Sequence, residues 1–305
     1  MKNKLIYLTY QSFPSFKANT LQTIDNLNYL SKYFEIELIF PLREKNSSDD
    51  MSVLKNYYYI DKNIKVQGVV HNYPFGKIKM FENLLFIISH FLWSKKIVKK
   101  IGRENVNYFF TRSDWVFYFL ARKNKRVVFE CHQLSKIRKF VMKKSIEYQH
   151  SRIIFLNNLL KADSGINSKK FEDKLIVLHN GVDSNLFKSD TAKDKKRVIF
   201  IGNLKRFGEN RNLDFYISTF KNKNMPIDFK FTIIGTPRAE VDRLNKYIKK
   251  TGLEKNVEVK HWVKRQEAIE ALNKSSIGLL INTKNNEHSV KYPSPLKYLN
   301  TFMEN

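Results

Sequence analysis

The chain has 305 residues, of which 42% are hydrophobic and 14% aromatic, so it is long and apolar enough to bury the cores of two ordinary domains. Its 55 Lys and Arg against 29 Asp and Glu give a formal charge of +26, which attracts polyanions such as nucleic acid, anionic lipid or a sugar nucleotide, although a lysine-rich habit of the source explains the same charge. One cysteine, Cys131, excludes an intrachain disulfide and suits a reducing compartment, and no paired Cys and His spacing predicts a zinc site.

The first half of the chain alternates short apolar runs with longer periodic segments. This alternation predicts βα units and a parallel sheet. Helices are expected at residues 20–33 and from about residue 78 to 100. Strands are expected at residues 4–9, 35–40, 64–70, 108–111, 126–130 and 151–156.

Residues 84–93 form the longest apolar run, and lysines and an arginine flank it on both sides. The run is shorter than 18 residues, so no transmembrane helix is expected, and the N-terminus turns polar too soon for a signal peptide. A short apolar helix with basic flanks suits a membrane interface. The slightly favoured alternative is a helix that packs on a sheet and keeps its lysines in water.

The chain turns at Asn180-Gly181, where we expect glycine to adopt a positive φ. Polar residues 183–196 then form a linker, after which strands are predicted at 197–202, 229–235, 256–260 and 277–282, and helices at 212–220, 239–251 and 266–274. The predicted fold is α/β, with two Rossmann-like doubly wound domains at 1–182 and 197–305. Ligands of such sheets bind at the carboxyl ends of the strands. Neither glycine-rich nucleotide motif, GxGxxG or GxxxxGK[ST], is present, which argues against a dehydrogenase or a P-loop NTPase.

A helix start is predicted near the end of the chain. Ser294 suits the cap and Pro295 the first residue, and the free backbone N–H groups of a helix start suit a phosphate. Lys297 in the first turn indicates an anionic ligand or is simply solvated.

Several sequence blocks occur in a fixed order along nearly the whole chain: residues 16–22, 129–132, 174–183 with Phe187, 198–203, 231–235, 257–263 and 294–297. Together they resemble the retaining glycosyltransferases of the GT-B fold, family 4, of the glycosyl transferases group 1 type. The resemblance implies a hexosyl- or related glycosyltransferase, which moves a sugar from a nucleotide-sugar to an acceptor with retention of configuration. It implies a donor-binding second domain and an acceptor-side first domain. It also implies no cofactor and no metal, because basic side chains and helix ends neutralise the diphosphate.

The resemblance assigns His132 as the catalytic residue, beside the reacting sugar; the alternative is a histidine with a structural partner. Glu130 is expected to be structural, paired with a local cation or backbone N–H. The resemblance implies that a first-domain loop, residues 12–20, approaches the donor phosphates or the transferred sugar, and its polar candidates are Lys17, Asn19 and Thr20. The alternative is an ordinary strand-to-helix loop, in which Asn19 or Thr20 caps the helix that follows.

The remaining expected site residues bind the donor. Asn203 stands where the family has an arginine, and Arg211, Lys205 or Arg206 is expected to reach the diphosphate unless these are solvated loop cations. Residues 261–263 lie where relatives hold the nucleobase. The helix start would bind phosphate, while Asn300 replaces a glutamate that grips the ribose hydroxyls, which weakens that contact. The helix-start residues are Ser294, Pro295, Leu296 and Lys297.

The chain ends at Asn305, before the strands and helices with which the family normally continues, so the second domain is expected to be incomplete. The first hypothesis is a cytoplasmic, peripheral membrane enzyme of polysaccharide, lipopolysaccharide or glycolipid biosynthesis. Its partners are a nucleotide-sugar, a glycan or lipid-linked acceptor and an anionic membrane surface. The second hypothesis is an inactive truncated relative. The third, a basic nucleic-acid-binding protein, is disfavoured because aromatic residues lie in core-like runs and no such motif occurs.

Overall fold

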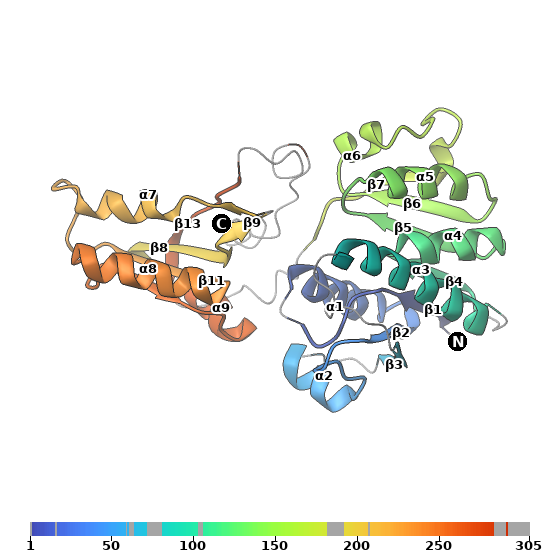
Figure 1. The fold of residues 1–305 in the computed structure, drawn as a ribbon, viewed down its shortest axis with the longest axis horizontal. Helices are drawn as coiled ribbons and strands as arrows, with labels where there is room; N and C mark the ends of the chain where they lie inside the picture. Colours follow the sequence, from blue (N-terminus) through green and yellow to red (C-terminus); the bar gives the residue numbers. More distant parts are fainter. Residues whose placement is uncertain are drawn as a thin grey trace. The chain divides into compact units, whose positions relative to one another are not determined.

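The computed structural model describes residues 2–15, 17–58, 60, 64–71, 81–102, 106–181, 192–206, 208–283 and 291. The chain divides into two compact units, Met1–His179 and Asn180–Asn305. Each unit is an α/β layer structure around a parallel sheet, as Figure 1 shows. The predicted class of Rossmann-like, doubly wound α/β domains is therefore confirmed.

The first unit contains a seven-stranded parallel sheet in the order β3-β2-β1-β4-β5-β6-β7. Six of the strands were predicted to within two residues, because each is a short apolar run between polar segments. The three-residue strand β7 was not among them. The strands are β1 (Asn3–Leu8), β2 (Phe34–Leu42), β3 (Lys65–Val70), β4 (Tyr108–Thr111), β5 (Val127–Cys131), β6 (Ser151–Phe155) and β7 (Leu175–Val177).

Six α-helices of the first unit are described: α1 (Ala18–Leu30), α2 (Met51–Tyr58), α3 (Glu82–Ile101), α4 (Asp114–Arg122), α5 (Lys136–Ser145) and α6 (Asn158–Asp163). A 3₁₀ turn, Glu172–Lys174, precedes β7. Three helices begin with a side-chain cap, in which Ser113, Ser135 and Asn157 accept a bond from a backbone N–H three residues on.

Helix α1 begins differently from the predicted alternative. Lys17 occupies the N-cap position and provides no side-chain bond, so capping by Asn19 or Thr20 is wrong. The hydroxyl of Thr20 instead donates to the backbone carbonyls of Ser15 and Lys17, so this side chain points towards the loop that precedes α1.

The core of the first unit brings the two halves of each βα unit together. Leu5 and Tyr7 of β1 pack with residues of β2 and with Ile24 of α1 and Leu54 of α2. Helices α3, α4 and α5 contact one another in sequence, and right-handed crossovers place them over the opposite face of the sheet from α1. All strands being parallel, the loops after β1, β4 and β5 leave the sheet at the same edge.

The second unit has a four-stranded parallel sheet among its described residues, in the order β12-β11-β8-β13. Strand β8 begins at Asp194, so the last three residues of the predicted linker belong to a strand, because the pairing with β13 continues to Ser275. Strand β13 ends at Gly278, before the predicted end at residue 282. The strands are β8 (Asp194–Asn203), β11 (Lys230–Thr236), β12 (Val257–Lys260) and β13 (Ser275–Gly278).

The helical segments of the second unit lie close to their predicted positions. They are α7 (Leu213–Ser218), a 3₁₀ turn at Thr219–Lys221, α8 (Arg238–Thr251) and α9 (Arg265–Asn273). A small hairpin that was not predicted follows β8, formed by β9 (Lys205–Arg206) and β10 (Glu209–Asn210).

Two glycines behave differently from each other. Gly181 does not adopt the expected positive φ, and an added Cβ there would meet no atom within 4 Å. At Gly235, an added Cβ would lie 2.4 Å from the carbonyl oxygen of Gly202. A side chain at position 235 would therefore clash with the backbone of Gly202, so this position requires glycine.

Candidate functional site

A buried polar cluster lies at the carboxyl ends of β4 and β5. Arg112 follows β4, Glu130 is near the end of β5, and His132 follows β5. The Nε atom of Arg112 lies 2.6 Å from Oε2 of Glu130, and the other carboxylate oxygen lies 3.3 Å from Nε2 of His132. The predicted structural pairing of Glu130 with a local cation is confirmed.

The same arginine reaches the predicted first-domain loop. Nη1 of Arg112 donates to the carbonyl oxygen of Asn19 at 3.0 Å and to the hydroxyl of Thr23 at 3.2 Å, both in α1. Among the loop candidates, Lys17 and Asn19 expose their side chains, whereas Thr20 is buried. The structure therefore joins the start of α1 to His132 through Arg112 and Glu130.

The electrostatics of this cluster keep the carboxylate charged. Burial alone would raise the pKa of Glu130, but Arg112 and His132 outweigh it and hold that pKa at about 2. Burial lowers the pKa of His132, and the positive charge of Arg112 lowers it further.

His132 is therefore a neutral imidazole at neutral pH, with 26% of its side chain exposed. The carboxylate beside Nε2 favours the tautomer protonated there, which leaves Nδ1 as an acceptor. Such a group can orient a hydroxyl or accept its proton.

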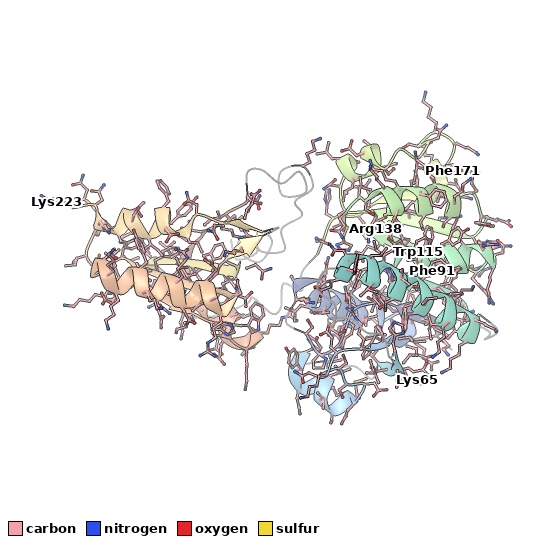
Figure 2. The ribbon with its side chains drawn as sticks, in the orientation of Figure 1. Lys65, Phe91, Trp115, Arg138, Phe171 and Lys223 are labelled. Atoms are coloured by element: carbon pink, nitrogen blue, oxygen red, sulfur yellow. The ribbon has the colours of Figure 1, made fainter. Side chains whose placement is uncertain are left out.

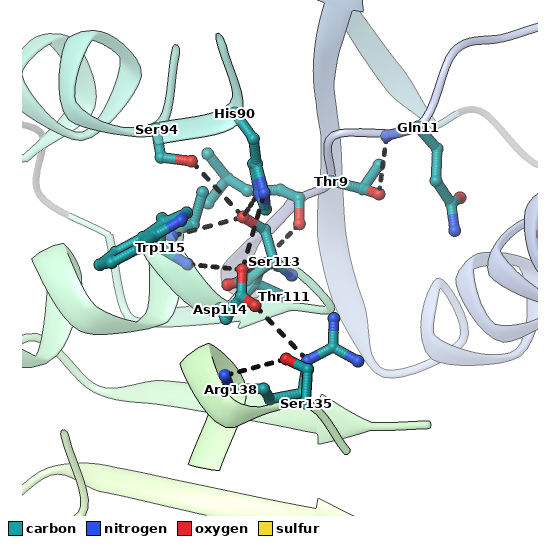
Figure 3. A network of polar contacts seen from close by, with 12 residues as sticks. Thr9, Gln11, His90, Ser94, Thr111, Ser113, Asp114, Trp115, Ser135 and Arg138 are labelled. Atoms are coloured by element: carbon teal, nitrogen blue, oxygen red, sulfur yellow. Dashed lines mark hydrogen bonds and ion pairs between the residues drawn. The ribbon is translucent and has the colours of Figure 1, made fainter. Parts of the chain in front are cut away.

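A second network lies beside the first and joins three helices, as Figure 3 shows. Nε2 of His90 in α3 lies 2.5 Å from the hydroxyl of Ser113, and its Nδ1 lies 3.6 Å from Asp114 at the start of α4. The other oxygen of Asp114 lies 3.5 Å from Nε of Arg138 in α5. Arg138 also donates to the carbonyl of Gln133, the neighbour of His132.

His90 lies between a serine hydroxyl, Ser113, and a carboxylate, Asp114, as the histidine of a nucleophilic triad does, but this network is structural. Ser113 is only 3% exposed, and its oxygen caps α4. Burial lowers the pKa of His90 to about 4, so the imidazole is neutral. We infer that the network fixes the positions of α3, α4 and α5 relative to one another and to the segment after β5 that carries His132.

Arg112 is the functional candidate that sequence reasoning missed. It directly follows a predicted strand, at the same edge of the sheet as His132. The rule that ligands bind at the carboxyl ends of parallel strands applies to both residues. That rule, applied to every strand in turn, is the signal that would have found Arg112.

In the second unit, three predicted donor residues lie at the end of β8 and around the hairpin that follows. The side-chain oxygen of Asn203 accepts a bond from the hydroxyl of Thr236 at 3.0 Å. Nζ of Lys205 lies 2.5 Å from a carboxylate oxygen of Glu240, in the first turn of α8.

Arg211 is not a solvated cation. Its side chain is buried, its Nη1 donates to the carbonyl of Ile281, and its guanidinium lies over the ring of Phe200 at 5.7 Å. The alternative of a solvated loop arginine is therefore wrong at this position. Its expected bond to a diphosphate stays a prediction.

Other predicted donor residues fall where less is described. Residues 261–263 directly follow β12, so they lie at the carboxyl edge of the second sheet, as a base-binding segment requires. The side chain of Arg206 lies outside the described part of the structure, as do Ser294, Pro295, Leu296, Lys297 and Asn300. Within the described residues, no group of three or more His, Cys, Asp and Glu side chains is placed to hold a metal ion.

Comparison with known proteins relates both units to sugar-transferring enzymes. Residues 182–288 match the family model of Glycosyl transferases group 1. A capsular polysaccharide biosynthesis glycosyltransferase, CapH of Staphylococcus aureus, is 22% identical over 251 residues, which cover 78% of this chain. The matched part spans 64% of the length of that relative.

Solved structures show the same fold. Anabaena HepE in complex with UDP and glucose superposes with a TM-score of 0.59 at 14% identity, covering 90% of this chain and 73% of that one. A Rickettsia africae glycosyltransferase gives 0.60 at 15% identity, covering 91% and 73%. S. aureus TarM in complex with UDP, fondaparinux and α-GlcNAc-glycerol gives 0.61 at 11% identity, covering 90% and 80%. The chain thus has the α/β fold of GT-B glycosyltransferases, as predicted.

Proposed function

We propose that the chain is a glycosyltransferase that moves a sugar from a nucleotide-sugar to an acceptor hydroxyl with retention of configuration. One observation carries the proposal: the match to group 1 glycosyl transferases falls on residues 182–288, which include the parallel sheet of the second unit. The carboxyl edge of that sheet gathers Asn203, Lys205 and Arg211.

The second unit would hold the donor. Gly202 and Gly235 are partners near the ends of β8 and β11 and carry no side chains, which would let a diphosphate approach the backbone at this edge of the sheet. Lys205 and the helix predicted to start at Pro295 would neutralise its charge without a metal. Because HepE was solved with UDP and glucose, UDP-sugars are the first donors to test.

The first unit would present the acceptor and His132. A neutral imidazole held by Glu130 can hydrogen-bond a sugar hydroxyl and position the acceptor without adding charge. Arg112 is a positioning residue in this scheme, because it fixes the carboxylate that orients the imidazole. The start of α1, which Arg112 binds through the carbonyl of Asn19, would then flank the reacting sugar.

The acceptor would be a growing polysaccharide, lipopolysaccharide or lipid-linked glycan at the cytoplasmic face of the membrane. The support is the relative CapH, whose name assigns it to capsular polysaccharide biosynthesis. No described helix of this chain is long and apolar enough to cross a bilayer.

The test combines donor binding with transfer. We expect UDP-sugars to raise the melting temperature of the full chain, with the same rise in EDTA. Mass spectrometry of a glycan-acceptor mixture should then show product. His132→Ala should keep the melting-temperature rise and lower transfer by about 10²- to 10³-fold, whereas the control His150→Ala should change neither.

Other outcomes would support the alternatives. A folded chain that no nucleotide-sugar stabilises would favour an inactive glycosyltransferase-like protein. Retention on DNA that falls steeply with salt, without any response to nucleotide-sugars, would favour a nucleic-acid-binding protein.

A further inference from the structure

Helix α3 carries a stripe of exposed apolar side chains. Leu84, Ile88 and Leu92 are 55%, 39% and 47% exposed. They are spaced by four residues, so they lie on one side of the helix. The opposite side of α3 is buried, with Trp93 and Ile97 fully inside the first unit. Three large apolar side chains in one exposed row are unusual on a protein that remains in water.

The same side of α3 turns basic in its last two turns. Lys95 and Lys99 continue the row, three and seven residues after Leu92, and both are exposed. Lys96 and Lys100 stand beside them and are also exposed. One side of a single helix therefore presents an apolar half followed by a cationic half. We call the row Leu84, Ile88, Leu92, Lys95 and Lys99 the α3 face.

Aromatic residues border this face. Phe91 of α3 packs edge-on against Trp115 of α4 with ring centroids 5.0 Å apart, and the two labels stand together in Figure 2. Phe119 of α4 lies 5.4 Å from Phe91. All three rings are only partly buried. Partly exposed aromatic rings beside apolar and cationic groups are typical of surfaces at a membrane–water boundary.

We propose that the α3 face is a peripheral docking surface for an anionic lipid bilayer. Leu84, Ile88 and Leu92 would enter the boundary between headgroups and acyl chains. Lys95 and Lys99 would extend their stems along it and reach the lipid phosphates. This inference rests on the proposed function, because a glycosyltransferase with a lipid-linked acceptor benefits from binding the membrane that holds the acceptor.

The observations favour a bilayer over other occupants. Nucleic acid would pair with the lysines but gains nothing from three exposed aliphatic side chains. A second copy of the chain would bury the apolar half, but each copy carries +26 and like charges repel. Anionic lipid satisfies both halves of the face at once.

The experiment is co-sedimentation of the full chain with vesicles of phosphatidylglycerol and phosphatidylcholine, and with vesicles of phosphatidylcholine alone. We expect binding to the anionic vesicles only. Lys95→Ala with Lys99→Ala should weaken it by about 30-fold. The matched control, Lys249→Ala with Lys250→Ala in the last turn of α8, should weaken it much less.

A second pair of variants tests the apolar half. Leu84→Glu with Ile88→Glu should abolish vesicle binding, whereas Ile227→Glu, a change at a side chain 89% exposed in the second unit, should retain it. Unchanged melting temperatures would show that these exposed changes leave the fold intact.

Three results would overturn the inference: no binding to anionic vesicles, equal binding to neutral vesicles, or a concentration-dependent dimer that Leu84→Glu dissolves. Donor-induced stabilisation, measured without lipid, separates this inference from the proposed function. Loss of vesicle binding with a retained donor response overturns only the docking surface. Vesicle binding without any donor response overturns only the glycosyltransferase proposal.

Discussion

Replacing Glu130 by glutamine tests the buried cluster of the first unit through pH. The ordinary pKa of this carboxyl is 4.5, and in the folded chain it is held at about 2. That difference corresponds to about 3 kcal/mol of stability. Because the folded pKa is the lower one, this stability is fully present above pH 4.5 and is lost as the pH falls towards 2.

Glu130→Gln also leaves Arg112 buried without its carboxylate, so we expect the variant to be about 3 kcal/mol less stable at pH 7. At pH 3 the wild-type chain has lost about 2 kcal/mol of its advantage. The gap between the two proteins should therefore close to about 1 kcal/mol. The assay is urea unfolding followed by tryptophan fluorescence, since Trp93 is fully buried in the first unit.

The control is Glu147→Gln, which removes an exposed carboxylate paired with Lys170. Exposed pairs contribute little, so this change should shift stability by less than about 1 kcal/mol at either pH. If the gap between wild type and Glu130→Gln stays constant from pH 7 to pH 3, the carboxylate is not the charged centre of the cluster and the reasoning fails.

Three further predictions concern single residues. Gly235→Ala should destabilise the second unit by about 2 kcal/mol or more, since its Cβ would meet a backbone oxygen, while Gly181→Ala should be neutral in the same thermal unfolding scan. Arg211→Ala should lower stability by about 1–3 kcal/mol through the orphaned carbonyl of Ile281, and should weaken donor binding; unchanged donor affinity by calorimetry would remove Arg211 from the site. Burial raises the pKa of Cys131 to about 11, so a thiol reagent at pH 8 should label it only after unfolding, and rapid labelling of the native chain would contradict the described burial.

The sheets were predictable because their strands are short apolar runs that parallel pairing buries on both faces. Helices α4 and α5 were not predicted, for opposite reasons. Helix α4 contains an unbroken apolar run, residues 115–121, which is equally typical of a buried strand, and α5 is dominated by cations. In both, the usable signal was the capping serine, Ser113 or Ser135, ahead of the first turn.

The candidate residues His132 and Asn203 came from the family resemblance, and the structure places both at the carboxyl ends of strands. Apart from the pairing of Glu130 with a cation, the contacts within the site were not predictable, because they join residues far apart in the chain. Arg211 is held by a carbonyl 70 residues away, and Arg112 by one 93 residues away. No local pattern distinguishes such an arginine from one that is free to bind a phosphate.

The double grip of Arg112 has a consequence for protein engineering. The guanidinium of Arg112 binds both the backbone of Asn19 and the side chain of Glu130. The positions of the chain at the carboxyl ends of β1, β4 and β5 therefore depend on one another. A chimaera that exchanges only the segment from β1 into the first turn of α1 would place the carbonyl of residue 19 wrongly for Arg112. Transplanting substrate preference between such enzymes therefore requires moving all three segments as a set.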